Sequence, residues 1–199
     1  LINRLPVKMY QPINVKLGDT LKLNNAINGA RCYIAISGGL KVKSIFGSKS
    51  FFSNITDSYY LKKNDEIKVS KKSKNKILKW DRFNFKLNRS IEVFKGPEFD
   101  LLSSNSKNKL FKNEFTISTN NRMAYNLVEK LQVGTKSIIS SPVLPGSVQL
   151  TPSGKMIILH RDCQTTGGYP RILQLNKSSL NYLSQLKSTD KIKLRLINL

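Results

Sequence analysis

Short stretches in which apolar and polar residues alternate dominate the chain. In residues 12–24 (PINVKLGDTLKLN) an apolar side chain stands at every second position from 13 to 17, Gly18 and Asp19 interrupt the alternation, and it resumes at Leu21 and Leu23. Successive side chains of a β-strand point to opposite faces, so this pattern is typical of strands with one buried face. We expect a half-buried β-hairpin here, with its turn at the glycine.

The turn and the strand that follows it recur twice later in the sequence. GDTLKL around Asp19 has counterparts in NDEIKV around Asp65 and TDKIKL around Asp190. In each case an aspartate able to hydrogen-bond nearby backbone is followed, after one residue, by an apolar-Lys-apolar alternation. Two interpretations stay open: common strand-start chemistry, or two related barrel halves.

The second half of the chain contains further strand patterns. Residues 90–95 (SIEVFK) and 191–197 (KIKLRLI) predict strands. Residues 143–159 predict a hairpin whose four-residue turn, Thr-Pro-Ser-Gly, has proline at its second position and glycine at its fourth. Residues 115–133 fit both a strand and a helix, because their apolar residues recur at spacings compatible with either.

Two short helices are expected among these strands. Pro97, Glu98 and Asp100 suit the first turn of one helix. The pattern of KSSLNYLSQL predicts the other, capped by Ser178 or Ser179.

Strands outnumber helices, so the predicted fold class is mostly β, as one barrel or a pair of barrels. The polar, basic segment 70–88 separates the halves, and we expect domains at residues 1–87 and 88–199.

The net charge of +22, from 34 basic and 12 acidic residues, suggests a nucleic-acid partner. Lysine outnumbers arginine 26 to 8 and asparagine occurs 19 times, a composition expected of an AT-rich coding sequence. Arginine is the preferred reader of bases and phosphates, and the densest basic run, residues 68–79, lacks aromatic residues that could stack on bases. A solvated basic surface is therefore favoured over specific nucleic-acid binding.

The chain has no run of eighteen apolar residues and no signal-peptide pattern, so neither a membrane span nor secretion is predicted and a cytoplasmic location is expected. Its cysteines, Cys32 and Cys163, are too far apart in sequence for a disulfide framework. With His160 as the only histidine, no zinc site and no serine-protease-type triad are predicted.

Two pairs of glycines are candidates for anion binding. In DCQTTGGYP, Gly167 and Gly168 permit positive φ angles, so consecutive backbone N–H groups could converge on one anion; an ordinary tight loop is the alternative. Gly38 and Gly39 repeat the theme, followed by GSKS. Ser48 breaks the spacing of a Walker motif, so no P-loop is predicted.

Several segments together resemble one known family. They are GARCYIAISGGL with GSKS, GPEFDLL, NNRMAYNL, SSPVLPGSVQLTPSGKMIILHRDCQTTGGYPRI and LNYLSQLKSTDKIKLRL. In this order they resemble the KipA family, which is the C subunit of bacterial 5-oxoprolinase, once labelled the second subunit of allophanate hydrolase, and is related to the carboxyltransferase domain of urea carboxylase. The resemblance covers nearly the whole chain, and its motifs are most specific between Ser140 and Ile172.

The resemblance implies two cyclophilin-like β-barrel domains, with a KipI-like B subunit and a LamB/YcsF-like A subunit as partners. The family's assembly opens the lactam of 5-oxoproline, a small cyclic amide, to glutamate at the expense of ATP with Mg²⁺. Biotin stays open as a further cofactor, because the related carboxyltransferase domains act with biotin carriers. No metal site is implied within this chain itself.

Roles for individual residues follow from the same resemblance. Arg122 would neutralise a carboxylate, Gln149 would orient the substrate amide or a water, and Asp162 would bind metal-nucleotide or act as a base. Each has a structural alternative, such as an ion pair for Arg122 and a turn cap for Asp162. The residues expected to bind substrate or phosphate are Gly38, Gly39, Ser48, Thr165, Thr166, Gly167, Gly168 and Tyr169.

The chain departs from the family pattern in two places. Asn121, Ala124 and Asn126 replace the aspartate, glycine and second arginine usual in that segment. Family members also carry a Q-D-x-G-R segment before the region where this sequence begins, so we expect an incomplete first barrel that lacks its N-terminal strands. Three functions stay open: a component of 5-oxoprolinase, a KipA-like regulator that binds a KipI-type kinase inhibitor without turnover, and a basic RNA-binding module.

Overall fold

The computed structural model describes residues 1–52, 54–56, 60–71, 90–132 and 137–198. The chain divides into two compact units, the first made of Leu1–Asn24 and Cys32–Phe83, and the second of Asn25–Arg31 and Asn84–Leu199. The predicted domain boundary after residue 87 lies in segment 72–89, outside the described residues, so that boundary stays a prediction.

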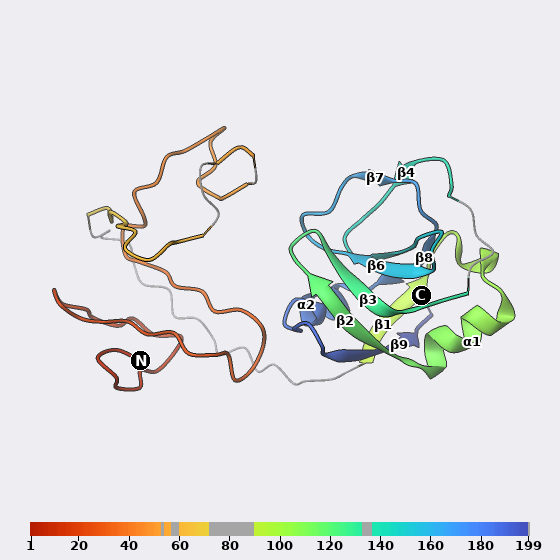
Figure 1. Cartoon of the computed structure of the whole chain (residues 1–199), viewed down its shortest axis with the longest axis horizontal. Coiled ribbons are helices and arrows are strands. Elements are labelled where there is room, and N and C mark those ends of the chain that lie inside the picture. Colours follow the sequence, from red (N-terminus) through yellow and green to blue (C-terminus); the bar gives the residue numbers. More distant parts are fainter. Residues whose placement is uncertain (53, 57–59, 72–89, 133–136, 199) are drawn as a thin grey trace. The chain divides into compact units, whose positions relative to one another are not determined.

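The second unit is built on a closed seven-stranded barrel (Figure 1). The strands follow one another around the barrel as β1, β8, β5, β6, β3, β2 and β9, and only the β1–β9 pair is parallel. Closure leaves this sheet no unpaired edge. In chain order, the barrel strands are β1 Ser90–Lys95, β2 Glu114–Asn120, β3 Ala124–Lys130, β5 Ser147–Leu150, β6 Lys155–Leu159, β8 Arg171–Leu175 and β9 Lys191–Leu196.

Alternation along the strands explains the barrel core. In β9, Ile192 and Leu194 are fully or almost fully buried, while the three basic residues between and beside them are exposed. The segment that fitted both periodicities forms the β2–β3 hairpin, in which Tyr125 and Leu127 are buried and Met123 is exposed. Burial at every second position therefore decides for the strand, and the mostly β prediction is confirmed.

The predicted β5–β6 turn forms as expected, with the Gly154 N–H donating to the Thr151 carbonyl at 2.9 Å. The helices are the 3₁₀ turn η1 (Phe99–Leu101), α1 (Ser104–Lys112) and α2 (Lys177–Leu183). The predicted cap of α2 is wrong: the Asn176 side chain, not Ser178 or Ser179, accepts from the Ser179 N–H at 2.8 Å. Asparagine before the first turn satisfies a donor that has no partner within the helix.

In the described part of the first unit, pairing is limited to isolated bridges such as Ile2 with Leu21 and Leu40 with Val69. The hairpin expected over 12–24 differs accordingly: its turn forms, but Val15, Leu17 and Leu23 are more than half exposed. A two-stranded ribbon without a covering layer gains too little burial to persist as a regular ladder. The expected incomplete barrel stays a prediction.

The recurring aspartate turn has the same geometry at all three sites. Each carboxylate accepts the backbone N–H of the lysine three residues earlier at 2.7 Å. The residue before each aspartate has a left-handed φ: +89° at Gly18, +72° at Asn64 and +76° at Thr189. The predicted hydrogen bonding to nearby backbone is confirmed, whereas a common origin of the three segments stays a hypothesis.

No helix in the described ranges is long and apolar enough to cross a membrane.

Candidate functional site

The predicted site residues fall into both units. Gly38, Gly39 and Ser48 belong to the first unit, and the rest of the predicted set belongs to the second. In the second unit most of them gather on β5 and on the segment 162–169 between β6 and β8. Part of that segment, β7 (Thr166–Gly167), pairs with β4 (Ser141–Pro142) in a separate two-stranded sheet (Figure 1).

The backbone of β7 does not form the predicted nest. Neither Gly167 nor Gly168 has a left-handed φ. Gly167 pairs with Ser141, and the carbonyl of Gly168 accepts from the Ile138 N–H at 2.9 Å. A nest of converging N–H groups needs a residue in the left-handed region, and neither glycine supplies one. The prediction of converging amides is therefore wrong: pairing with β4 holds Gly167 in a strand, and Gly168 follows β7 without a left-handed φ.

Close packing explains the glycine at 167. A Cβ there would lie 2.5 Å from Nε2 of Gln149 and 3.5 Å from a methyl carbon of Val143. The first contact is shorter than real Cβ contacts, so a larger residue would force either β7 or the Gln149 side chain to move. Close approach of the backbone, the second property expected of these glycines, is present at Gly167.

Gln149 lies against β7 and is only 1% exposed. Its Nε2 donates to the Tyr169 carbonyl at 3.5 Å, and its Oε1 accepts from Nε2 of Gln164 at 3.4 Å. Both distances are long for hydrogen bonds, so the carboxamide is weakly held. Tyr169 itself is 38% exposed. The predicted role of Gln149 toward a substrate stays a prediction.

The residues just before Gln149, in the PGSVQ sequence of positions 145–149, have a structural role. Gly146 has a φ of +94°, and a Cβ there would lie 2.6 Å from Nε2 of Gln174. The Ser147 hydroxyl donates to Oε1 of Gln174 at 2.8 Å, while Nε2 of Gln174 donates to the Pro145 carbonyl at 3.0 Å. This part of the motif builds the entry into β5.

Arg122 and Asp162 form a two-pronged ion pair. Nε of Arg122 donates to Oδ2 of Asp162 at 2.5 Å and Nη2 donates to Oδ1 at 2.8 Å. Both side chains are substantially exposed, at 66% and 44%. The guanidinium holds the pKa of the Asp162 carboxyl below its ordinary value. The two predicted catalytic residues thus engage each other, as in the structural alternative, and the lowered pKa opposes a role for Asp162 as a base.

His160 is a buried residue near this pair that sequence reasoning used only to exclude metal sites and triads. It is 5% exposed, its ring packs on Tyr125 with centroids 5.4 Å apart, and neither ring nitrogen has a hydrogen-bond partner of ordinary geometry among the described residues, the Leu180 backbone being the polar group that acts on the ring. Burial, reinforced by Arg31 and Arg161, lowers the pKa of the imidazole. His160 is therefore neutral at pH 7. Being the only histidine was its one signal in the sequence.

In the first unit, Gly38 and Gly39 do have left-handed φ angles, +84° and +77°. The Gly39 N–H donates to the Ile36 carbonyl at 2.9 Å, and the Gly39 carbonyl accepts from the Ser70 N–H at 3.0 Å. The Ser48 N–H likewise donates to the Ile45 carbonyl at 3.0 Å. The amides of Gly39 and Ser48 are thus engaged in turns, and anion binding by this group stays a prediction.

Within the described ranges, no three side chains of His, Cys, Asp or Glu are grouped so that they could hold a metal ion.

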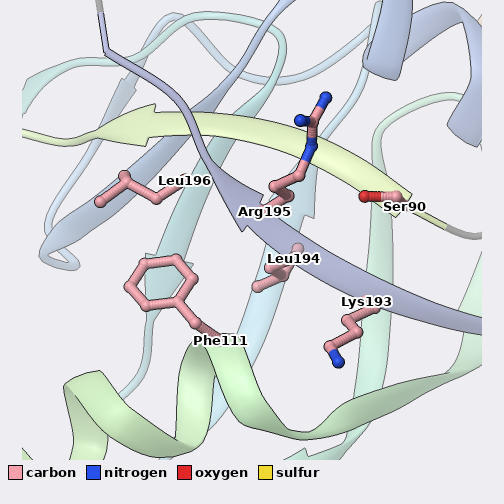
Figure 2. Close-up of a pocket in the computed structure, with 6 residues that line it drawn as sticks. All are labelled: Ser90, Phe111, Lys193, Leu194, Arg195 and Leu196. Atoms are coloured by element: carbon pink, nitrogen blue, oxygen red, sulfur yellow. The ribbon is translucent and has the colours of Figure 1, made fainter.

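A groove of about 510 Å³ lies between α1 and β9 (Figure 2). Phe111, Leu194 and Leu196 contribute its apolar surface, and Lys193 and Arg195 bring positive charge. Arg195 also pairs with Glu92. No residue of the predicted site lines this groove.

Comparison with known proteins supports the resemblance found in the motifs. Residues 1–196 match the family described as "Carboxyltransferase domain, subdomain A and B". Two curated relatives carry the name of the C subunit of 5-oxoprolinase. The one from Escherichia coli is 28% identical over 179 residues, which is 86% of this chain and 58% of the relative. The one from Haemophilus influenzae is 27% identical, over 100% of this chain and 66% of the relative.

This chain therefore spans less than two thirds of the length of either relative. A solved structure, the urea carboxylase of Kluyveromyces lactis, superimposes with a TM-score of 0.82 at 21% identity, over 99% of this chain and 20% of that protein. At this identity the likeness shows the fold. The family match over nearly the whole sequence decides the classification: this chain belongs to the carboxyltransferase domain family, subdomains A and B.

Proposed function

We propose that this chain is a component of an ATP-dependent complex that opens cyclic amides, with 5-oxoproline as its substrate. The observation that carries the proposal is the match of most of the chain to two relatives named as the C subunit of 5-oxoprolinase. The segment that links β6 to β8 adds support, because it places several hydrogen-bond donors on the surface of a closed barrel.

Opening a lactam places negative charge on the substrate. 5-Oxoproline carries a carboxylate, and its amide oxygen gains charge as the ring opens, so the site needs donors at both ends. Thr165 and Thr166 are exposed and carry hydroxyl groups, and the N–H of Gly168 donates to no other described residue. These three groups are the donors that we propose for the substrate, in place of a nest of converging amides.

Arg122 is proposed to bind the substrate carboxylate by exchanging partners. Its ion pair with Asp162 is exposed, and exposed pairs contribute little to stability. Replacing one carboxylate by another at the same guanidinium is therefore inexpensive, and it preserves the two-pronged geometry. Asp162 then serves to hold Arg122 in place before substrate arrives.

ATP with Mg²⁺ is proposed for the assembled complex, with a KipI-like B subunit and a LamB/YcsF-like A subunit as partners. The described ranges hold no group of three or more carboxylate, histidine or cysteine side chains for a metal ion. Mg²⁺ bound with ATP needs only one or two protein carboxylates, so we assign it to no single subunit. No step on this chain is assigned to biotin.

Reconstitution with both partner subunits tests the proposal. We expect ATP consumption that requires 5-oxoproline and forms glutamate in a fixed ratio to ADP. Arg122→Gln should raise the KM for 5-oxoproline at least about tenfold, because a charged hydrogen bond is lost. Complex formation without any ATP consumption would overturn the proposal and favour the regulator. Binding to random RNA that weakens steeply with salt would instead favour the RNA-binding module.

A further inference from the structure

We infer that Arg171, held by Glu98, is a positioning residue that fixes the β4–β7 sheet and so sets where the donors of segment 165–168 lie. The inference deepens the proposed function and rests on it for the meaning of the site. The structural part of the inference is that Arg171 and Glu98 act as a clamp that holds β4 and β7 in place, and this part can be tested without any activity.

The clamp consists of four hydrogen bonds from one arginine. Nε of Arg171 donates to Oε2 of Glu98 at 2.9 Å, and Nη2 donates to Oε1 at 2.7 Å. The backbone N–H of Arg171 donates to Oε2 at 2.8 Å. The remaining prong, Nη1, donates to the carbonyl of Pro142 in β4 at 2.8 Å. One arginine thus joins β8, the start of the η1 turn and β4.

This pair is the least exposed ion pair in the described ranges. The side chains of Arg171 and Glu98 are 19% and 16% exposed, whereas every other pair has at least one partner more than 40% exposed. The guanidinium lowers the pKa of the Glu98 carboxyl, and the carboxylate raises the pKa of Arg171. A two-pronged pair that water reaches poorly holds its geometry better than an exposed one.

Local sequence places Glu98 against Arg171. The Gly96 N–H donates to the Ile172 carbonyl at 2.9 Å, and a Cβ at Gly96 would lie only 2.1 Å from the Arg171 carbonyl oxygen. Glycine therefore lets the chain cross β8 in contact with its backbone. The Glu98 N–H then donates to that same carbonyl at 3.2 Å, which fixes the start of η1 and keeps the carboxylate beside the guanidinium.

The Pro142 bond transmits the clamp to the candidate site. Pro142 pairs with Thr166, and on either side the Val143 N–H donates to the Thr165 carbonyl and the Ile138 N–H to the Gly168 carbonyl, both at 2.9 Å. The β4–β7 sheet has two residues in each strand, too few to persist unsupported. By holding the Pro142 carbonyl, Arg171 supplies an anchor for this sheet.

Hydrogen exchange on the full chain tests the clamp. The sharpest variant is Arg171→Lys, which keeps the charge opposite Glu98 but lacks the fork that reaches Pro142. Glu98→Gln is the second variant. The matched control is Asp100→Asn, because Asp100 pairs with Lys107 nearby in sequence, at 3.1 Å and largely exposed. Exchange is followed at the amides of Val143 and Ile138, whose hydrogen bonds flank the β4–β7 sheet, and of Ile117, which donates to Asp190 elsewhere on the barrel.

We expect Arg171→Lys and Glu98→Gln to accelerate exchange at Val143 and Ile138 about tenfold, the effect of losing a charged hydrogen bond. Ile117 should be unchanged in both variants, and all three amides should be unchanged in Asp100→Asn. Unchanged exchange at Val143 in Arg171→Lys would overturn the inference. Equal acceleration at Ile117 would overturn it as well, because the pair would then serve global stability alone.

Activity gives the second readout. In the reconstituted complex, Arg171→Lys should lower kcat for 5-oxoproline at least about tenfold with the melting temperature nearly unchanged, since displaced donors bind the transition state less well. If Val143 exchanges faster while kcat is unaltered, Arg171 does hold the β4–β7 sheet, but its role in positioning the substrate donors is overturned. If the wild-type complex shows no turnover, the proposed function fails, and the exchange data still decide on the clamp.

Discussion

The recurring aspartate turn with its apolar-Lys-apolar alternation, called the shared phrase below, forms a regular strand in one unit of this protein and not in the other. After Asp190, the apolar residues of the phrase are Ile192 and Leu194, and both are buried in β9. After Asp19 they are Leu21 and Leu23, which are 47% and 54% exposed. The aspartate turns that precede them share one geometry. The difference therefore arises beyond the turn, in what covers the apolar face.

Burial accounts for the difference. Removing a leucine or isoleucine side chain from water contributes about 1.5–3 kcal/mol, which helps to offset the entropy lost when residues are fixed in a strand. In the barrel, β9 receives this contribution and also pairs with strands on both sides. Alternation specifies which face of a strand is apolar, but a second layer is needed to make the strand regular.

The largest expected effect comes from shortening matched residues of the two phrases. Ile192→Ala should lower the free energy of unfolding of the barrel by about 2–5 kcal/mol, because it leaves a cavity in the core. Leu21→Ala should change it by less than about 0.5 kcal/mol, as surface substitutions do. Urea denaturation followed by far-UV circular dichroism measures both. Equal losses would contradict the contrast between the units.

Glycine substitutions sharpen the comparison at the two glycine pairs. Gly39→Ala should destabilise the protein by about 1–2 kcal/mol, because its Cβ would enter open space and the penalty comes from the left-handed backbone alone. Gly167→Ala should cost less than about 1 kcal/mol, since its Cβ would meet only the weakly held amide end of the Gln149 side chain, which can move aside. Thermal unfolding gives the order, and a larger loss at Gly167 would contradict the free movement of the Gln149 carboxamide.

The buried histidine predicts a pH dependence confined to the barrel. The pKa of His160 is lowered below its ordinary 6.5, so the unfolded chain binds the proton more tightly than the folded one. The contribution of His160 to the free energy of unfolding is therefore fully present above pH 6.5, and it is lost as the pH falls from there through the pKa of the folded state. His160→Phe should remove that part of the dependence. Unfolding curves at about pH 8 and about pH 5.5 give the difference in the free energy of unfolding between the two pH values. The same difference in His160→Phe as in the wild-type protein would show that His160 is not its source.

The smallest expected effect concerns the exposed ion pair. Asp162→Asn should alter the free energy of unfolding by less than about 1 kcal/mol, because the pair is open to solvent. Rising ionic strength should reduce the contribution of the pair in the wild-type protein, so the difference between the two proteins should shrink. Denaturation at low and high salt measures both effects. A large, salt-independent loss would indicate that the pair is a structural element of the barrel.

Sequence reasoning recovered what depends on local pattern. The alternation in β1, β6 and β9, the turn at Gly154 and the three aspartate turns are all set by residues within a few positions of one another. The cap of α2 was misplaced because serines and an asparagine stand together at the start of that helix, and all suit a cap. Arg122 and Asp162 lie 40 residues apart, so no local pattern links them. The family resemblance, and not the pattern, marked both as site residues.

The candidate site was harder to predict because pairing over long sequence distances governs it. A glycine pair after two threonines suits a nest or a strand equally, and only the partner strand β4 decides for the strand. Glu98 and Arg171 lie 73 residues apart, and no local pattern connects them. His160 gave no signal beyond its rarity, since its burial is a property of the packed fold.

Amide hydrogen exchange at Leu23 and Leu194 tests the contrast most directly, because both residues occupy the last position of the shared phrase in the same intact chain. We predict that the Leu194 amide, in a strand paired on both sides, exchanges at least about a thousandfold more slowly than an unprotected amide, the factor that global stability confers. Leu23 should exchange at nearly the unprotected rate. Comparable protection at the two leucines would contradict the claim that a covering layer, and not the phrase itself, makes the strand.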